Sequence, residues 1–258
     1  MKIVVCVKYV PDSTADRGFN SDNTVDRAGV DGVLSELDEN AVEAALTIKD
    51  TTDAEVTLLT MGPDSARAAI LKGLQMGADA GVHVADDAIH GSDAVATSLV
   101  LAKALATRDY DVVLCGMAST DGGMSVVPAM LAERLSVPQL TFASEFSIDD
   151  GVVRIRRDAD TATMTVEAAT PLVLSVTDQA NEPRYPSFKG IMAAKKKPVK
   201  TLTVGDLGID PSAVGLAGAG TEVVDFAVRP PRQAGVIVKD DGDGGVKAAE
   251  FLAARKFI

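Results

Sequence analysis

Residues 112–125, VVLCGMASTDGGMS, join an apolar run to a glycine-containing loop and the start of a helical pattern, and this unit decides the fold. The run Val112 to Cys115 is short, continuous and rich in branched side chains, which is typical of a strand buried on both faces. The pattern that follows, Ser125 to Leu135, predicts a helix. A buried strand that leads directly into a helix is the repeating unit of a parallel sheet.

The same unit recurs on both sides of this stretch. We expect strands at four further apolar runs, which are Ile3 to Val7, Glu55 to Met61, Gly81 to Val84 and Leu172 to Val176. Helical patterns lie between them at Glu39 to Lys49, Pro63 to Met76 and Asp93 to Ala106, with Asp38 and Ser92 as N-caps. This alternation predicts an α/β fold, a parallel sheet with right-handed crossovers and helices on both faces.

Two segments interrupt the alternation. Lys8 to Leu37 is a long, polar connection, and connections of this length are usually functional or mobile. Val152 to Ala169 alternates between apolar and polar residues around a turn at 158–160. That pattern predicts a β-hairpin inserted before the strand at Leu172.

The chain changes character after Val176. Residues 184–200 carry six basic residues and no acidic one. Residues 201–245 are rich in Gly, Pro, Ala and Asp and have no helical pattern, which returns at Val246 to Phe257. We therefore expect an α/β domain at 1–183, a basic recognition loop and helix at 184–200, and an extended C-terminal arm at 201–258 that packs against another chain.

Composition argues against several classes of protein. A net charge of −12 over 258 residues, with few aromatic residues and no Trp, disfavours binding to nucleic acid. Cys6 and Cys115 are expected to be reduced core thiols, and His83 and His90 to be polar surface residues, so no metal site is expected. No apolar stretch is long enough to span a membrane, and the N-terminus runs straight into a strand, so we expect a cytoplasmic protein.

Ligands of parallel α/β sheets bind at the carboxyl ends of the strands, which here are the loops after Val7, Met61, Val84 and Cys115. In the last of these, Gly122 and Gly123 allow the backbone to approach a ligand closely, and the helix that follows offers free amides to a phosphate. An ordinary strand-to-helix turn explains the same spacing equally well. No GxGxxG, GxxxxGK[ST] or GxSxG pattern occurs, so the chain is expected to hold a cofactor without catalysing a reaction itself.

Residues 181–198, NEPRYPSFKGIMAAKKKP, are the most distinctive segment. Large apolar side chains stand among lysines, and apolar anchors in a charged setting are typical of a docking site for another protein. The expected docking residues are Tyr185, Phe188, Ile191 and Met192.

This segment resembles the signature of the beta (small) subunit of electron transfer flavoproteins. The resemblance extends to VCVKYVPD (5–12), DENAVEAA (38–45), residues 61–63, 77–79, 116–131, 157–171 and 205–208. It implies a Rossmann-like parallel sheet that binds an adenine nucleotide. It also implies a heterodimer in which an alpha subunit supplies most contacts to a redox-active FAD, while this chain holds a structural AMP.

Carried onto this chain, the resemblance places the AMP site at the predicted strand ends. The implied cofactor-binding residues are Cys6, Leu37, Asp38, Met61, Gly116, Ser119, Thr120, Asp121, Gly122, Gly123, Met124, Ser125, Val126 and Val127. The loop backbone and Ser125 would hold the phosphate, and the surroundings of Cys6, Leu37 and Met61 would hold adenine. The family often has Asp at the position of Gly123 and Gln at that of Val126, so backbone amides take a larger share here.

The resemblance also implies partners. The segment around Phe188 would dock acyl-CoA dehydrogenases of fatty acid β-oxidation, and the shared FAD would pass electrons to a flavoprotein-quinone oxidoreductase. Some members bind a second FAD in place of AMP and bifurcate electrons, and that alternative stays open. A stand-alone adenine-nucleotide sensor that resembles the universal stress proteins is the main rival, although the loop at Gly116 lacks its GxxGxxxxxxxxxG(S/T) pattern.

Overall fold

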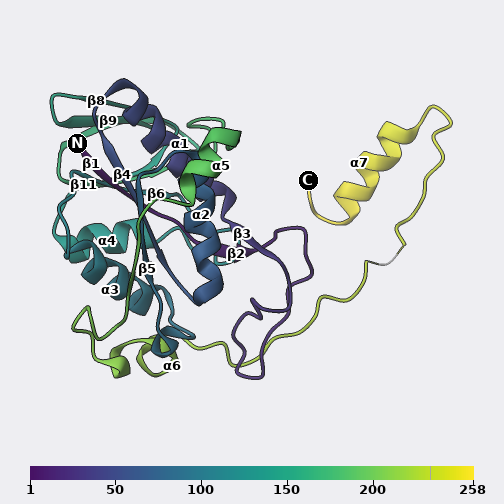
Figure 1. Ribbon diagram of the computed structural model, residues 1–258. Helices are drawn as coiled ribbons and strands as arrows, with labels where there is room; N and C mark the ends of the chain where they lie inside the picture. The colour runs from purple at the N-terminus through teal and green to yellow at the C-terminus, as the bar shows by residue number, and fades with distance from the viewer. Residues whose placement is uncertain (233) are drawn as a thin grey trace. The chain divides into compact units, whose positions relative to one another are not determined.

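A seven-stranded parallel sheet forms the centre of the computed structural model, with strand order β12-β5-β4-β1-β6-β11-β7 (Figure 1). The structure describes residues 1–232 and 234–258, which form two compact units, Met1–Val224 and Asp225–Ile258. The strands of the sheet are β1 (Lys2–Cys6), β4 (Glu55–Met61), β5 (Ala80–Val84), β6 (Val112–Gly116), β7 (Gln139–Ala143), β11 (Leu172–Val176) and β12 (Val199–Leu202). The predicted Rossmann-like α/β class is confirmed.

Helices cover both faces of this sheet (Figure 1). One face packs against α1 (Glu36–Thr51), α2 (Arg67–Met76) and α5 (Phe188–Ala194), and the other against α3 (Ala94–Leu105) and α4 (Val127–Leu135). Alternate residues of each strand enter opposite cores: Ile3 and Val5 of β1 face α1, whereas Val4 and Cys6 face the α3 side. The continuous apolar runs in the sequence follow from this two-sided burial.

All five predicted strands are confirmed to within a few residues, and the sheet has two more. β7 and β12 are its edges, and edge strands carry polar residues that hide the apolar pattern of a buried strand. β12 pairs with β5 in parallel from Val199 to Leu202. Short 3₁₀ turns precede α2 and α3, at Asp64–Ala66 and Asp87–Ile89.

The predicted hairpin is confirmed as β9 (Val152–Asp158) and β10 (Thr163–Ala169). A third strand that the sequence did not suggest, β8 (Glu145–Asp149), pairs with β9 in an antiparallel sheet of order β10-β9-β8. Val153 and Ile155 of β9 are buried against the core on the α1 side. The hairpin is therefore packed onto the main sheet rather than free in solvent.

The long connection after Lys8 contains structure of its own. β2 (Tyr9–Pro11) and β3 (Gly32–Leu34) form an antiparallel ribbon at its two ends. Residues 12–31 form the loop between them. The two ends of this loop are thus held together near the carboxyl end of β1.

The predicted starts of α1 and α4 and both predicted N-caps, Asp38 and Ser92, were wrong. α1 begins earlier, after Ser35, so that Asp38 lies buried inside its first turn instead of capping it. Asp93, not Ser92, caps α3 by accepting a hydrogen bond from the Ala96 amide, because its carboxylate is already in reach of the first turn. α4 begins at Val127, two residues after Ser125, whose φ of 58° is left-handed and incompatible with a helix.

The segment expected as an arm divides at 224 rather than 200. From the last residue of β12 onward, the core on the α3 side buries Leu202, Val204, Leu207, Ile209 and Val214. A short 3₁₀ turn (Pro211–Ala213) and α6 (Gly215–Gly218) follow. These apolar residues are too widely spaced to show a period in the sequence, which is why a lack of core was expected. The second unit holds α7 (Gly244–Ala254), and none of its described residues is buried.

Candidate functional site

The carboxyl ends of three neighbouring strands, β4, β1 and β6, bring together candidate residues that lie far apart in the sequence. Cys6 ends β1, Met61 ends β4 and Gly116 ends β6, while Leu37 and Asp38 belong to the first turn of α1. The approach of α1 to β6 is close: a Cβ on Gly116 would lie 2.7 Å from the Leu37 carbonyl oxygen and 2.6 Å from Asp38 Oδ1. Glycine is therefore required where β6 ends.

Asp38 ties the ends of two strands to α1. Its Oδ2 accepts a hydrogen bond from the Lys8 amide at 2.8 Å, and its Oδ1 accepts one from the Gly116 amide at 3.2 Å. Burial raises the pKa of Asp38 to about 7, although both amides and the Lys8 charge act in the opposite direction. Both carboxyl oxygens are engaged within the protein, so Asp38 shapes the site rather than offering a free charge to it.

The loop after β6 is shaped by bonds to Ser119. The Gly122 amide donates to Ser119 Oγ at 3.3 Å, and the Gly123 amide donates to the Ser119 carbonyl oxygen at 2.9 Å. Gly123 has a φ of 62°, a left-handed conformation that glycine adopts without strain. No described atom lies within 4 Å of a Cβ placed on Gly123, so the backbone there is open to a ligand.

Asp121 fastens this loop to the connection that follows β1. One carboxylate oxygen pairs with Lys8 Nζ at 2.8 Å and the other with an Arg27 guanidinium nitrogen at 2.6 Å, while the Asp121 side chain is only 3% exposed. Burial alone would raise the pKa of Asp121, but the charges and hydrogen bonds of Lys8 and Arg27 hold it well below its usual range. Arg17 adds a hydrogen bond to the Thr120 carbonyl oxygen at 3.0 Å.

Sequence reasoning missed Lys8, Arg17 and Arg27 as parts of the site. They contact residues about a hundred positions later in the chain, and no motif links such distant partners. The available signal was the unusual length and polarity of the connection that carries them.

The start of α4 lies in the same strand-end region. Among the described residues no side chain caps this helix, whose N-cap position is Val126, and Pro128 in its first turn has no amide hydrogen. Amides in the first turn of a helix have no intrahelical acceptor, and the helix dipole is positive there. Met124 is exposed and Ser125, Val126 and Val127 are partly exposed, so this end is accessible to an anion.

The expected docking residues lie on and just before α5. Ser187 caps this helix by accepting a hydrogen bond from the Gly190 amide. Tyr185 is 91% exposed and Phe188 82% exposed, while Ile191 and Met192 are exposed to a smaller degree. Large apolar side chains held this far out in solvent are what a binding surface for another protein requires.

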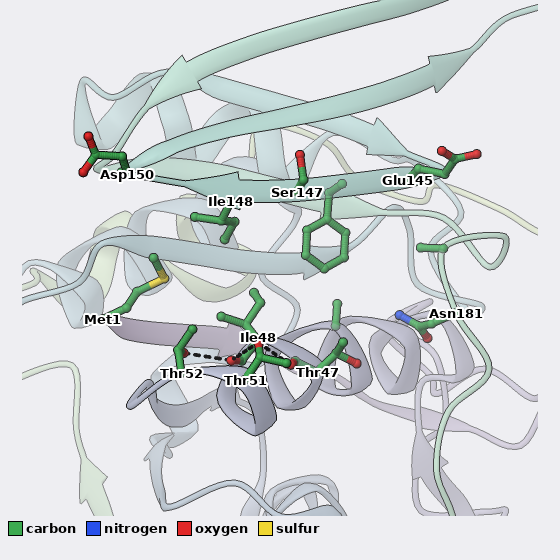
Figure 2. Close-up of a pocket in the computed structure, with 14 residues that line it drawn as sticks. Met1, Thr47, Ile48, Thr51, Thr52, Glu145, Ser147, Ile148, Asp150 and Asn181 are labelled. Carbon is green, nitrogen blue, oxygen red and sulfur yellow. Dashed lines mark hydrogen bonds between the residues drawn. The ribbon is translucent and has the colours of Figure 1, made fainter.

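A groove of about 660 Å³ lies elsewhere, between α1 and β8. Figure 2 shows Ile148 of β8 pointing toward α1, with Thr47 and Ile48 opposite it. Its lining residues are Met1, Ala44, Thr47, Ile48, Thr51, Thr52, Glu145, Phe146, Ser147, Ile148, Asp150, Gly151, Ala180 and Asn181, which are distinct from the candidate nucleotide-binding residues.

The cysteines and histidines have structural partners. Cys6 and Cys115 are free and buried, and their hydrogen bond together with burial raises the pKa of the Cys115 thiol. His83 is buried, not at the surface as expected, and its ring contacts the Gly62 carbonyl oxygen at 3.0 Å; exposed His90 pairs with Asp22 at 2.8 Å. Across the described residues no cluster of three or more His, Cys, Asp or Glu could hold a metal ion. No helix in the described part of the chain is long and apolar enough to cross a membrane.

Comparison with known proteins agrees with this architecture. Residues 22–207 match the electron transfer flavoprotein domain family. The chain is 46% identical to the electron transfer flavoprotein subunit beta of Mycobacterium leprae over 263 aligned positions, 99% of each chain. This chain belongs to the family of electron transfer flavoprotein beta subunits.

Other relatives in the family are more distant. The electron transfer flavoprotein subunit beta of Megasphaera elsdenii is 34% identical over the full length of both chains. The acryloyl-CoA reductase electron transfer subunit gamma of Anaerotignum propionicum is 34% identical over 93% of this chain and 92% of its own. Membership of the family implies electron transfer with a flavin and an alpha-subunit partner.

Proposed function

We propose that this chain binds AMP as a structural nucleotide and completes the FAD site of an alpha subunit. In this proposal it docks acyl-CoA dehydrogenases of fatty acid β-oxidation in the cytoplasm. Electrons then pass to the shared FAD and on to a flavoprotein-quinone oxidoreductase. The bound FAD supplies the redox chemistry, and this chain supplies position and recognition.

The observation that carries the AMP proposal is the uncapped start of α4 beside the open backbone of Gly123. A phosphate there would meet free amides and the positive end of a helix dipole, which supports binding of an anion. The adenine base would lie among Cys6, Leu37 and Met61, because Cys6 and Met61 end the neighbouring strands β1 and β4 and Leu37 lies in the first turn of α1. Because Asp121 is neutralised by Lys8 and Arg27, it does not repel the phosphate as a free carboxylate would.

Two further features support the roles toward partners. Arg17 and Arg27 hold the loop at residues 12–31 beside the loop after β6, which supports a role of residues 12–31 in bordering the FAD of the alpha subunit. The second unit, residues 225–258, exposes Val228, Ile237 and Phe257, which supports a role as an arm on the alpha subunit.

The nucleotide is tested by mass spectrometry of what the purified heterodimer releases on denaturation. We expect equal amounts of AMP and FAD. Release of ATP would instead favour the stand-alone nucleotide sensor, and release of no adenine nucleotide other than the FAD would contradict the AMP proposal.

A glycine variant locates the nucleotide. Gly123→Ala places a methyl group where the phosphate approaches, and we expect it to lose AMP while it retains FAD. Gly208→Ala is the matched control, because Gly208 has the same φ of 62° and the same lack of neighbours within 4 Å among described atoms. Both variants carry a backbone strain of about 1 kcal/mol, so a loss of AMP confined to Gly123→Ala reports on the site itself.

A second candidate function is electron bifurcation with a second FAD in place of AMP. The similarity to an acryloyl-CoA reductase electron transfer subunit favours it, because that relative serves a reductase. The same mass spectrometry separates the two functions: the bifurcating form should release FAD at twice the molar amount of the heterodimer and no AMP.

A further inference from the structure

Two distinctive segments of the sequence, residues 38–45 and 181–184, bind each other in the structure. Asn40 of α1 donates from Nδ2 to the Asn181 carbonyl oxygen at 2.9 Å. Asn181 in turn donates from Nδ2 to the Asn40 carbonyl oxygen at 3.0 Å. This reciprocal pair fixes the chain beside the first half of α1, just before the docking residues begin.

One turn further along α1, Glu43 holds Arg184. Glu43 Oε2 accepts hydrogen bonds from the Arg184 amide at 3.1 Å and from Nε at 2.7 Å, and Oε1 accepts a third from a terminal guanidinium nitrogen at 2.8 Å. The side chain of Glu43 is only 10% exposed. Asp50 adds a further bond to Arg184 at 2.8 Å, and hydrogen bonds to Glu43 and Asp50 raise the pKa of Arg184 despite its partial burial.

These contacts decide where residues 181–187 lie, because that segment is irregular. Ordering an irregular backbone costs about 1–2 kcal/mol per residue, and charge-assisted bidentate bonds are among the few local interactions strong enough to offset it. Loss of Arg184 would also leave the Glu43 carboxylate buried without its partner, which is strongly unfavourable.

The docking residues depend on this anchor. Tyr185 follows Arg184 directly, and Ser187 and Phe188 begin α5. Because Tyr185 and Phe188 are almost fully exposed, packing of their own side chains does not set their direction. The direction of Tyr185 is set by the backbone that precedes it, and that of Phe188 by the same backbone together with the packing of α5 through Ala194.

We propose that Asn40 and Glu43 are positioning residues that hold Asn181 and Arg184 on α1, so that Tyr185 and Phe188 meet a donor dehydrogenase in a fixed arrangement. The proposal rests on the docking role proposed above. A pre-ordered segment binds with a smaller loss of conformational entropy, so the anchor acts on affinity for the donor and not on electron transfer itself.

The test compares Glu43→Gln with Glu167→Gln in the co-purified heterodimer. Glu167 of β10 also accepts two hydrogen bonds from one arginine, Arg154, but it lies on the hairpin. We expect Glu43→Gln to speed hydrogen exchange in peptides from residues 181–197 and to raise the KM for the donor dehydrogenase roughly tenfold, with kcat little changed. Glu167→Gln should change neither, and both variants should retain their flavin.

Further variants complete the test. Arg184→Lys keeps the charge but not the two-pronged geometry, so its KM should lie between those of the wild type and Glu43→Gln. Unchanged exchange in Glu43→Gln would overturn the anchor, and faster exchange with an unchanged KM would overturn its role in presentation. Phe188→Ala distinguishes the underlying function: if that variant couples normally to the donor, the docking role itself is wrong, whatever the exchange data say.

Discussion

Two buried carboxyl groups of the candidate site titrate in opposite directions, and the reason is which groups face them. Asp121 is met by the charges of Lys8 and Arg27, which favour its ionised form. Asp38 is met mainly by the Lys8 and Gly116 amides, and these offset only part of the cost of burying its charge. Residue type alone therefore did not reveal that one of the two loses its charge near neutral pH.

Asp38 should make the protein less stable as the pH rises toward neutrality. Its folded pKa of about 7 lies above the ordinary value of 3.8, so its contribution is complete below pH 3.8 and is lost as the pH rises through 7. Over that window the loss approaches about 1.4 kcal/mol per pH unit. This loss is measured by urea unfolding of the wild type and of Asp38→Asn at pH 5.5 and pH 8.

The comparison between the two pH values isolates Asp38 from the other groups. The wild type should exceed Asp38→Asn in free energy of unfolding by more at pH 5.5 than at pH 8. A difference that is equal at the two pH values would show that Asp38 does not change its proton binding on folding.

At the scale of elements, the strand–helix units were predictable and the contacts between distant loops were not. A continuous apolar run predicts a buried strand such as β6, and a helical period of apolar residues predicts a helix such as α3. The edge strand β12 contains Lys200 and closely follows Lys195 to Lys197, which hides its apolar pattern, and the pairing of Lys8 with Asp121 leaves no local pattern. The strand-end position of the candidate site could be predicted for the same reason as the sheet, whereas its basic residues could not.

Asp121→Asn should release the connection after β1 from the loop after β6. The variant leaves Lys8 and Arg27 without their shared carboxylate, and we expect a loss of about 1–3 kcal/mol in the free energy of unfolding, since both cations remain partly exposed. Hydrogen exchange should rise in residues 12–31 and 116–125 together. Asp109→Asn, which breaks the exposed pair with Lys2, is the control and should leave both loops unchanged. A rise in only one loop would contradict the link.

For the whole molecule, the division at residue 224 separates a part with its own core from a part without one. Both cores on the two sides of the sheet are built from residues up to 214, and α7 of the second unit buries none of its described residues. The composition of the sequence predicted an appended arm that starts at residue 201. The structure places the boundary later, because the apolar residues of 201–214 enter the core although their spacing shows no period.

A chain that ends at Val224 should therefore fold and fail to hold its partner. We expect the thermal unfolding midpoint of the shortened chain to match that of the full chain, since residues 225–258 contribute no described buried side chain. Co-expressed with the alpha subunit, it should elute separately in size-exclusion chromatography. Elution as an intact heterodimer would show that the arm is not needed for association.

The attachment of the docking segment to α1 has a consequence for exchanging specificity between members of the family. A graft of residues 181–197 alone would bring a foreign arginine and asparagine onto a helix that was not selected to receive them. The graft must therefore include positions 40 and 43 of α1. Asp38 lies on the adjacent turn of the same helix and binds the amide that follows β1, so the strand ends of the recipient protein must also fit the grafted helix. Helix α1 and residues 181–197 therefore form one exchangeable module, although more than a hundred residues of sequence separate them.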